Sequence, residues 1–148
     1  MPNPPHISMS ELHQRISASF DTQGLMATLG AKLALVSDGE VHIALPFSQQ
    51  LSQQQGYVHA GAITSIVDTA CGYAALTKAP PECEVVTAEF KINFLRPALG
   101  DTFLAIGRVQ NSGTLLTVCI GEVRAFAGSA SAYKVVALMQ ATIVNVRQ

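Results

Sequence analysis

Charged residues are scarce in this sequence, and they are scarcest across its middle. Of the 148 residues, nine are Lys or Arg and ten are Asp or Glu. The 37 residues from Val41 to Thr77 contain only one of these, Asp68, where an even spread would give about five. An unpaired carboxylate in apolar surroundings is costly or shifts its pKa, so a fold that keeps one usually uses it. Asp68 is therefore the first candidate for chemistry.

Other patterns are missing as well. The net charge is −1 and no Lys/Arg cluster occurs, which argues against nucleic acid and a membrane surface as partners. The first twelve residues lack the basic and apolar regions of a secretory signal. The longest apolar stretch, Val135 to Val146, is too short to span a bilayer. We expect a soluble, cytoplasmic protein.

The sequence also lacks the residue spacings of several known catalytic and metal sites. Its three cysteines are an odd number without a CxxC pair, which argues against a disulfide framework and a zinc site. We expect them to be small buried hydrophobes. No GxSxG elbow, Walker loop or GxGxxG is present, and the four histidines do not have HExxH spacing. We expect no cofactor and no metal.

What the sequence does contain is a high apolar content of 49%, without a repeat or a long linker. This composition predicts a single domain over residues 10–148, preceded by a polar tail over residues 1–9. With only 13% charged residues, part of the surface is expected to meet another subunit.

The first half of the chain predicts two helices and a hairpin. Ser10 can cap a helix over residues 11–20, where apolar residues recur at spacings of four. Strands over 32–36 and 41–47 flank Asp38-Gly39, a strong hairpin signal. A second helix is predicted from about Ala60 to Lys78, because Pro80-Pro81 stops it.

The second half predicts strands. Residues 88–94 alternate strictly between apolar and polar, and further strands are predicted over 102–110, 115–126 and 133–146. The later strands carry apolar residues on both faces, which indicates a helix on one face and another subunit on part of the other. The predicted fold class is α+β, an antiparallel sheet wrapped around a long central helix.

The two faces of that helix differ. At 100° per residue one stripe is fully apolar and must face the sheet: Ile63, Ile66, Val67, Ala70 and Ala74. The opposite face has small residues around the carboxylate: Gly61, Thr64, Ser65, Asp68, Gly72 and Ala75. Asp68 there is either a structural acceptor for a hydroxyl such as that of Thr64, or a functional group approached by a ligand. The small residues favour function.

The start of the helix offers a second chemical element. Gly61 is on the same face as Asp68, two turns or roughly 10 Å toward the N-terminus, where free amides and the helix dipole suit an oxyanion. Asp68 would then act through a water or on a substrate lying along the helix. His59 is interpreted equally well as a tie between the loop and the helix as in a catalytic role, and Ser65 lacks a base.

The segment from Gly56 through His59, Ala60 and Gly61 to Asp68 resembles the G-x-x-H-G-G-x(6)-D signature of PaaI-type hotdog-fold thioesterases, which are acyl-CoA hydrolases. The segment Thr87 to Gly100 resembles the strand after the helix in that family, and the likeness covers about residues 24–146. The resemblance implies a hotdog fold with a short N-terminal helix, hydrolysis of an acyl- or aryl-CoA, and sites formed between subunits of a dimer or tetramer.

The resemblance also implies roles for single residues. Asp68 would be general base or nucleophile, and the amide of Gly61 or Ala60 would polarise the thioester carbonyl. Gln53 would orient the water or the carbonyl, and Thr87 of the facing subunit would help to hold the water. His59, Ala60 and Ser65 would contact substrate.

One residue departs from the signature, because Ala60 replaces the first Gly of His-Gly-Gly. Alanine keeps the amide, so we expect a helical φ at this position and retained activity.

Two alternatives to hydrolysis remain. The first is a non-catalytic acyl-CoA-binding module, whose usual regulatory form has an attached DNA-binding segment; the short non-basic stretch Met1 to Phe20 does not supply one. The second is an enoyl-CoA hydratase, which is disfavoured because no His follows Asp68.

Overall fold

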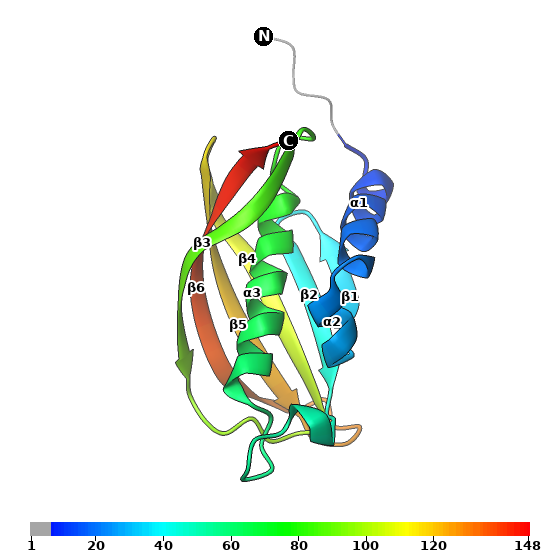
Figure 1. Cartoon of the computed structure of the whole chain (residues 1–148), viewed down its shortest axis with the longest axis vertical. Coiled ribbons are helices and arrows are strands. Elements are labelled where there is room, and N and C mark those ends of the chain that lie inside the picture. The colour runs from blue at the N-terminus through cyan, green and yellow to red at the C-terminus, as the bar shows by residue number, and fades with distance from the viewer. Residues whose placement is uncertain (1–6) are drawn as a thin grey trace.

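The computed structural model describes residues 7–148 and contains three α-helices, one 3-10 turn and six strands (Figure 1). In chain order the elements are α1 (Met9–Asp21), α2 (Gly24–Leu29), β1 (Lys32–Ser37), β2 (Glu40–Pro46), η1 (Gln49–Leu51), α3 (Ala60–Leu76), β3 (Cys83–Phe94), β4 (Thr102–Ser112), β5 (Leu116–Phe126) and β6 (Tyr133–Arg147).

The six strands form one sheet in the order β1-β2-β4-β5-β6-β3, and every neighbouring pair is antiparallel. The sheet curves around α3, which lies along its inner face, while α1 and α2 lie beside α3 on the β1 side (Figure 1). The predicted α+β class, with an antiparallel sheet around a long central helix, is confirmed.

The apolar stripe of α3 forms the centre of the core. All five predicted residues are at most 1% exposed: Ile63, Ile66, Val67, Ala70 and Ala74. The placement of Ala75 on the open face was wrong, because Ala75 is fully buried. The last turn of α3 is enclosed on more than one side, and Tyr73 and Leu76 are buried there as well.

The helix lies unusually close to the sheet at a pair of glycines. Gly107 of β4 and Gly121 of β5 are opposite each other in the sheet. A Cβ on Gly107 would be 2.4 Å from the carbonyl carbon of Ala70, and one on Gly121 would be 2.5 Å from a methyl of Val67. Only a hydrogen atom fits at these positions, so the two glycines allow α3 to pack closely against β4 and β5.

Strand β3 is an edge of the sheet, because it pairs only with β6. It begins at Cys83 rather than at Ala88 as predicted, and an irregularity between Thr87 and Glu89 shifts its register. The shift interrupts the period of two, which is why the alternating pattern reveals only the second half of the strand. Phe90 and Phe94, predicted on one side, are 41% and 47% exposed in the single chain.

The N-terminal helix begins earlier than predicted. Ser8, and not Ser10, is the N-cap, because its side chain accepts from the Glu11 amide while Glu11 accepts from the Ser8 amide. This reciprocal capping box satisfies two backbone donors at once. Residues 1–6 of the predicted tail lie outside the described residues, and Met9 already belongs to α1.

Two short elements were not predicted. Helix α2 has only six residues and ends at Gly30, whose φ is 74°; the 3-10 turn η1 has three residues. Both are too short for a periodic pattern to show.

The three cysteines, Cys71, Cys83 and Cys119, are free and buried as predicted. Burial raises the pKa of the Cys71 and Cys119 thiols, that of Cys119 to about 12. They are therefore unreactive as nucleophiles. Among residues 7–148 no helix is long and apolar enough to cross a membrane.

Candidate active site

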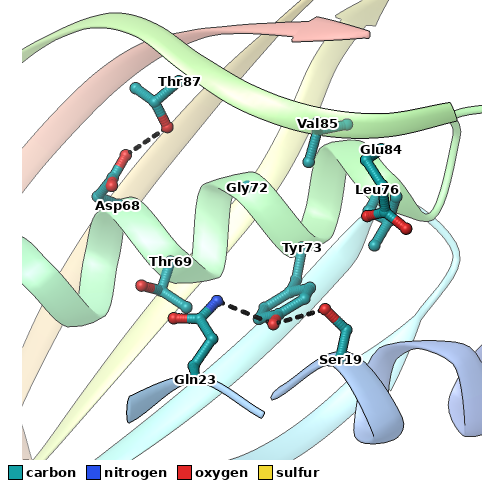
Figure 2. Close-up of a pocket in the computed structure, with 10 residues that line it drawn as sticks. All are labelled: Ser19, Gln23, Asp68, Thr69, Gly72, Tyr73, Leu76, Glu84, Val85 and Thr87. Carbon is teal, nitrogen blue, oxygen red and sulfur yellow. Dashed lines mark hydrogen bonds between the residues drawn. The ribbon is translucent and has the colours of Figure 1, made fainter. Parts of the chain in front are cut away.

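Asp68 is in the middle of α3 on the side turned away from β4 and β5, and it is partly buried beneath β3 (Figure 2). Its Oδ1 accepts a hydrogen bond of 2.8 Å from the Thr87 hydroxyl on β3. Burial raises the pKa of the Asp68 carboxyl above its usual value, and the hydrogen bond from Thr87 lowers it in part. The carboxylate is thus held in one position and made more basic than a free aspartate.

Thr87 reaches Asp68 within the same chain. The resemblance implied this hydroxyl from the facing subunit; in the single chain Thr87 itself supplies it, since β3 crosses α3 at this point, and a contribution across subunits stays a prediction. The alternative that Thr64 bonds to Asp68 is wrong. Thr64 and Ser65 donate to the carbonyls of Ala60 and Gly61, one turn back along the helix. The Ser65 hydroxyl therefore donates its hydrogen bond to the backbone and is not placed as a nucleophile.

A pocket of about 210 Å³ opens beside the carboxylate, between α3, β3 and the two N-terminal helices (Figure 2). Ten residues line it: Ser19, Gln23, Asp68, Thr69, Gly72, Tyr73, Leu76, Glu84, Val85 and Thr87. Gly72 is one turn after Asp68 and has no side chain to fill the pocket. A Cβ at this position would meet nothing within 4 Å, so the space beside the helix is open there. The predicted open face of small residues thus borders a real cavity at Asp68 and Gly72.

The amides at the start of α3 are not equivalent. His59 is the N-cap, and its Nδ1 accepts from the Gly61 amide at 2.7 Å. The role of His59 as a tie at the helix start is confirmed, but it occupies the very amide that was a candidate oxyanion donor. The Ala60 amide, by contrast, has no acceptor among the described residues. Ala60 is therefore the better placed oxyanion donor of the two.

The local geometry explains why alanine is tolerated at position 60 and glycine is kept at position 61. Ala60 is the first residue of α3, and no residue other than glycine in the described part of the chain has a positive φ. The expected helical backbone at Ala60 is thus confirmed. A Cβ on Gly61 would approach the His59 ring to 3.0 Å, which is tighter than ordinary contact and would disturb the cap.

Gln53 belongs to the loop in front of this helix start. A pocket of about 530 Å³ is lined there by Gln53, His59, Ala60 and Arg96, among others. The Gln53 side chain bonds to Gln55 in the same loop, with Nε2 donating to Oε1 at 3.0 Å. Gln53 is thus a neighbour of the Ala60 amide and not of Asp68.

The structure therefore places five of the predicted site residues in two groups, while Gly61 and Ser65 line neither of the two pockets. Asp68 and Thr87 line one pocket, whereas Gln53, His59 and Ala60 line another. Eight residues of helix separate Ala60 from Asp68, which is roughly 12 Å along the axis. This separation is too large for both groups of one chain to contact the same carbonyl.

Sequence reasoning missed a third group, in which Tyr73 bonds to two residues of the N-terminal region. The Tyr73 hydroxyl accepts from Gln23 Nε2 at 2.8 Å and shares a bond of 3.0 Å with Ser19 Oγ. The sequence offers no signal for this contact, because Gln23 directly precedes the short helix α2, which no periodicity reveals.

Comparison with known proteins identifies the family. The model of the thioesterase superfamily matches residues 55–130. A protein of Halobacterium salinarum that carries the name of an esterase is 34% identical over 114 residues, or 73% of each chain. A similarly named protein of Saccharolobus solfataricus is 28% identical over 127 residues, which cover 86% of this chain and 80% of that one. The chain belongs to the thioesterase superfamily.

Solved structures share the fold. A thioesterase family protein from Silicibacter pomeroyi is 37% identical with a TM-score of 0.89, covering 93% of this chain and 99% of that one. The PaaI protein from the phenylacetic acid degradation operon of E. coli is 24% identical with a TM-score of 0.80, covering 91% and 93%. The fold is the hotdog fold of PaaI-type thioesterases, as the resemblance implied. Family and fold together support a hydrolase that acts on thioesters.

Proposed function

We propose that this protein hydrolyses an acyl-CoA thioester to the free acid and CoA. The observation that carries the proposal is the half-buried Asp68, raised in pKa and held by Thr87 beside an open pocket. Thioesters suit such a simple site. A thiolate leaves readily, so one base and one oxyanion donor suffice.

In the proposed reaction the thioester carbonyl oxygen accepts a hydrogen bond from the Ala60 amide at the positive end of α3. Asp68 acts either as base, taking a proton from a water whose oxygen attacks the carbonyl carbon, or as nucleophile, forming an anhydride that water then opens. In both routes the carbon–sulfur bond breaks and CoA leaves with its electron pair as thiolate. Thr87 keeps the carboxylate oriented throughout.

A composite site between two copies of the chain supports the reaction best. Within one chain the Ala60 amide and Asp68 are roughly 12 Å apart, so a second copy must bring its helix start to Asp68. The edge strand β3 offers unpaired backbone groups and the exposed side chains of Val86, Phe90 and Phe94 for that contact. We therefore propose a homodimer as the smallest active form and a tetramer built from it. The cytoplasmic location stays a prediction.

The alternative of a non-catalytic acyl-CoA-binding module has the same fold and differs only in chemistry. The raised pKa of Asp68 favours catalysis, because a pure binding site has no use for a basic carboxylate. Release of free CoA thiol, followed with a colorimetric reagent, separates the two functions.

The central test is Asp68→Asn, which keeps the size and the acceptor oxygen but removes the base. We expect turnover of acyl-CoA substrates to fall by a factor of roughly a hundred or more. A raised folded-state pKa means that stability is lost as pH rises through the interval between the ordinary Asp pKa and the folded one. Removing the charge should therefore leave the Tm at pH 7 equal or higher.

The matched control is Asp21→Asn, at the exposed end of α1, which should hydrolyse at the parental rate. Parental turnover by Asp68→Asn across a panel of acyl-CoAs would refute the proposed function.

A further inference from the structure

The pocket beside Asp68 has an uncompensated negative charge. Two of its ten lining residues are carboxylates, Asp68 and Glu84, and none is Lys, Arg or His. Arg15 approaches this end of β3, but its guanidinium donates to the Cys83 carbonyl. Within the described part of the chain no ion pair joins Glu84 to a cation. Arg15 keeps its positive charge nearby, but the wall of the pocket itself presents two carboxylates and no cation to an entering anion.

The size of the pocket limits what can enter. Its volume of about 210 Å³ is somewhat larger than a cavity of about 150 Å³, which is known to hold one benzene molecule. Leu76 and Val85 supply apolar walls, and Gly72 leaves the helix side open. The pocket fits a short chain or a single ring, and a long acyl chain would extend beyond its walls.

One wall of the pocket is polar but uncharged. Tyr73, Gln23 and Ser19 form a hydrogen-bonded group there, and Thr69 lies next to Gln23 on the same side (Figure 2). The Thr69 hydroxyl has no partner among the described residues, and Ser19 and Gln23 keep unused hydrogen-bonding atoms. A neutral hydroxyl or carbonyl group on a ligand can bond to this wall.

Resting on the proposed function, we infer that this pocket receives the acyl group, and that Glu84 makes it select against acyl groups that carry a carboxylate. The substrate class is a short, uncharged acyl thioester, favoured further when it bears a hydroxyl. Repulsion gives this specificity, because the carboxylate of such an acyl group would lose its hydration next to the like charge of Glu84. The phosphates of CoA must lie outside this pocket for the same reason.

The experiment compares acyl groups on one carrier, so that CoA contributes equally to every measurement. The values of kcat/KM are measured for butyryl-CoA, 3-hydroxybutyryl-CoA, succinyl-CoA and dodecanoyl-CoA. For the parental protein we expect succinyl-CoA and dodecanoyl-CoA to be at least about tenfold poorer than butyryl-CoA, and 3-hydroxybutyryl-CoA to be the best. In Glu84→Gln the ratio of succinyl-CoA to butyryl-CoA should rise about tenfold.

Glu82→Gln is the matched control. Glu82 is exposed, two positions before Glu84, and does not line the pocket, so its variant should keep the parental ratios. Gln23→Met tests the polar wall and should reduce the preference for 3-hydroxybutyryl-CoA several-fold.

The outcomes separate the two levels of the argument. If Asp68→Asn loses hydrolysis, the proposed function stands. The inference is nevertheless overturned if succinyl-CoA is as good a substrate as butyryl-CoA, or if the ratio of kcat/KM for succinyl-CoA to that for butyryl-CoA is unchanged in Glu84→Gln. If no acyl-CoA is hydrolysed at all, both are overturned.

Discussion

At the scale of single residues, the helix start shows how a small substitution can be neutral at one position and harmful at the next. The Ala60 amide has no acceptor among residues 7–148 and Ala60 is exposed, whereas Gly61 faces the His59 ring that caps the helix. The chemistry that the signature supplies with two glycines therefore needs only one of them here. The proposed reaction requires the amide hydrogen of residue 60 to be kept.

Ala60→Pro removes that hydrogen and little else. Proline is favoured at the first position of a helix, and His59 already has the extended backbone, with φ −60° and ψ 137°, that a following proline requires. We expect a Tm close to the parental value and a kcat reduced by a factor of about a hundred to a thousand. Steady-state hydrolysis and thermal unfolding measure the two effects.

Ala60→Gly is the control for this variant, since it keeps the amide and restores the residue of the signature. It should retain parental kcat. Full activity in Ala60→Pro would show that the oxyanion is bound elsewhere.

Asp68 gives the reaction a dependence on pH whose direction follows from its surroundings. A base must be ionised, so kcat/KM should fall as pH decreases through the folded-state pKa of Asp68, which burial has raised. The hydrogen bond from Thr87 opposes that rise.

Thr87→Val removes the hydrogen bond at nearly constant volume. The acidic limb of the pH profile should consequently move to higher pH, with a lower rate at any pH below its plateau. Thr117→Val serves as a control for the loss of a hydroxyl, because Thr117 is buried on β5 and lines neither of the two pockets described. A limb that stays in place in Thr87→Val would mean that another group sets the profile.

Residue patterns alone pointed to one half of the candidate site. Asp68 stood out because a charge inside an apolar stretch is visible in the sequence alone. Thr87 came only from the resemblance, since a hydroxyl in a strand is unremarkable until the strand is known to cross the helix. The hydrogen bonds of Tyr73 were not predicted, because they are made to Ser19 and Gln23 of the N-terminal region. Ala75 was misplaced, because a helical wheel with one buried stripe does not describe the last turn of α3, which is enclosed on more than one side.

At the scale of elements, the position of α3 depends on the two glycines beneath it. Gly107→Ala would bring a methyl group to 2.4–2.5 Å from the backbone of Ala70 and Cys71, which cannot yield as a side chain can. We expect a loss of stability of about 1–3 kcal/mol or more, together with loss of activity as the helix is pushed outward. Denaturant unfolding and hydrolysis report the two losses.

Gly72→Ala is the contrasting change in the helix itself. Its methyl group would meet nothing within 4 Å, and alanine is a better helix former by about 1 kcal/mol. Stability should rise while the pocket beside Asp68 becomes smaller. A stable Gly107→Ala would show that the helix does not depend on this close contact.

Element boundaries were predicted less well than element types. The two long helices and all six strands were expected, since each has a clear period or a clear stop signal. The start of β3 was placed five residues late, because its register shift breaks the alternation. The Ser10 cap was placed two residues late, although Ser8 with Glu11 forms the capping box that the sequence already contained.

At the scale of the whole molecule, the two half-sites of one chain call for a partner. If each site combines Asp68 of one copy with the Ala60 amide of the other, two inactive variants should complement each other. In a mixture of Asp68→Asn with Ala60→Pro, each mixed dimer has one intact site and one doubly defective site. After joint refolding we expect recovery of up to about a quarter of parental activity, if the chains pair at random as a twofold dimer.

The control is each variant refolded alone at the same total concentration, which should remain inactive. Light scattering on the same samples verifies that dimers have formed. Dimers without recovered activity would show that every chain carries a complete site of its own.

The pair Gly107 and Gly121 has one more consequence, because α3 also carries Asp68. The depth at which a helix sits in a sheet fixes how far its outer side stands from whatever crosses above it. Because Gly107 and Gly121 have no side chains, α3 lies deeper in the sheet, at a depth where an Asp68 carboxyl oxygen is 2.8 Å from the Thr87 hydroxyl on β3. In the proposed reaction, the pKa of the base would therefore depend on two glycines on the opposite side of the helix from the carboxylate.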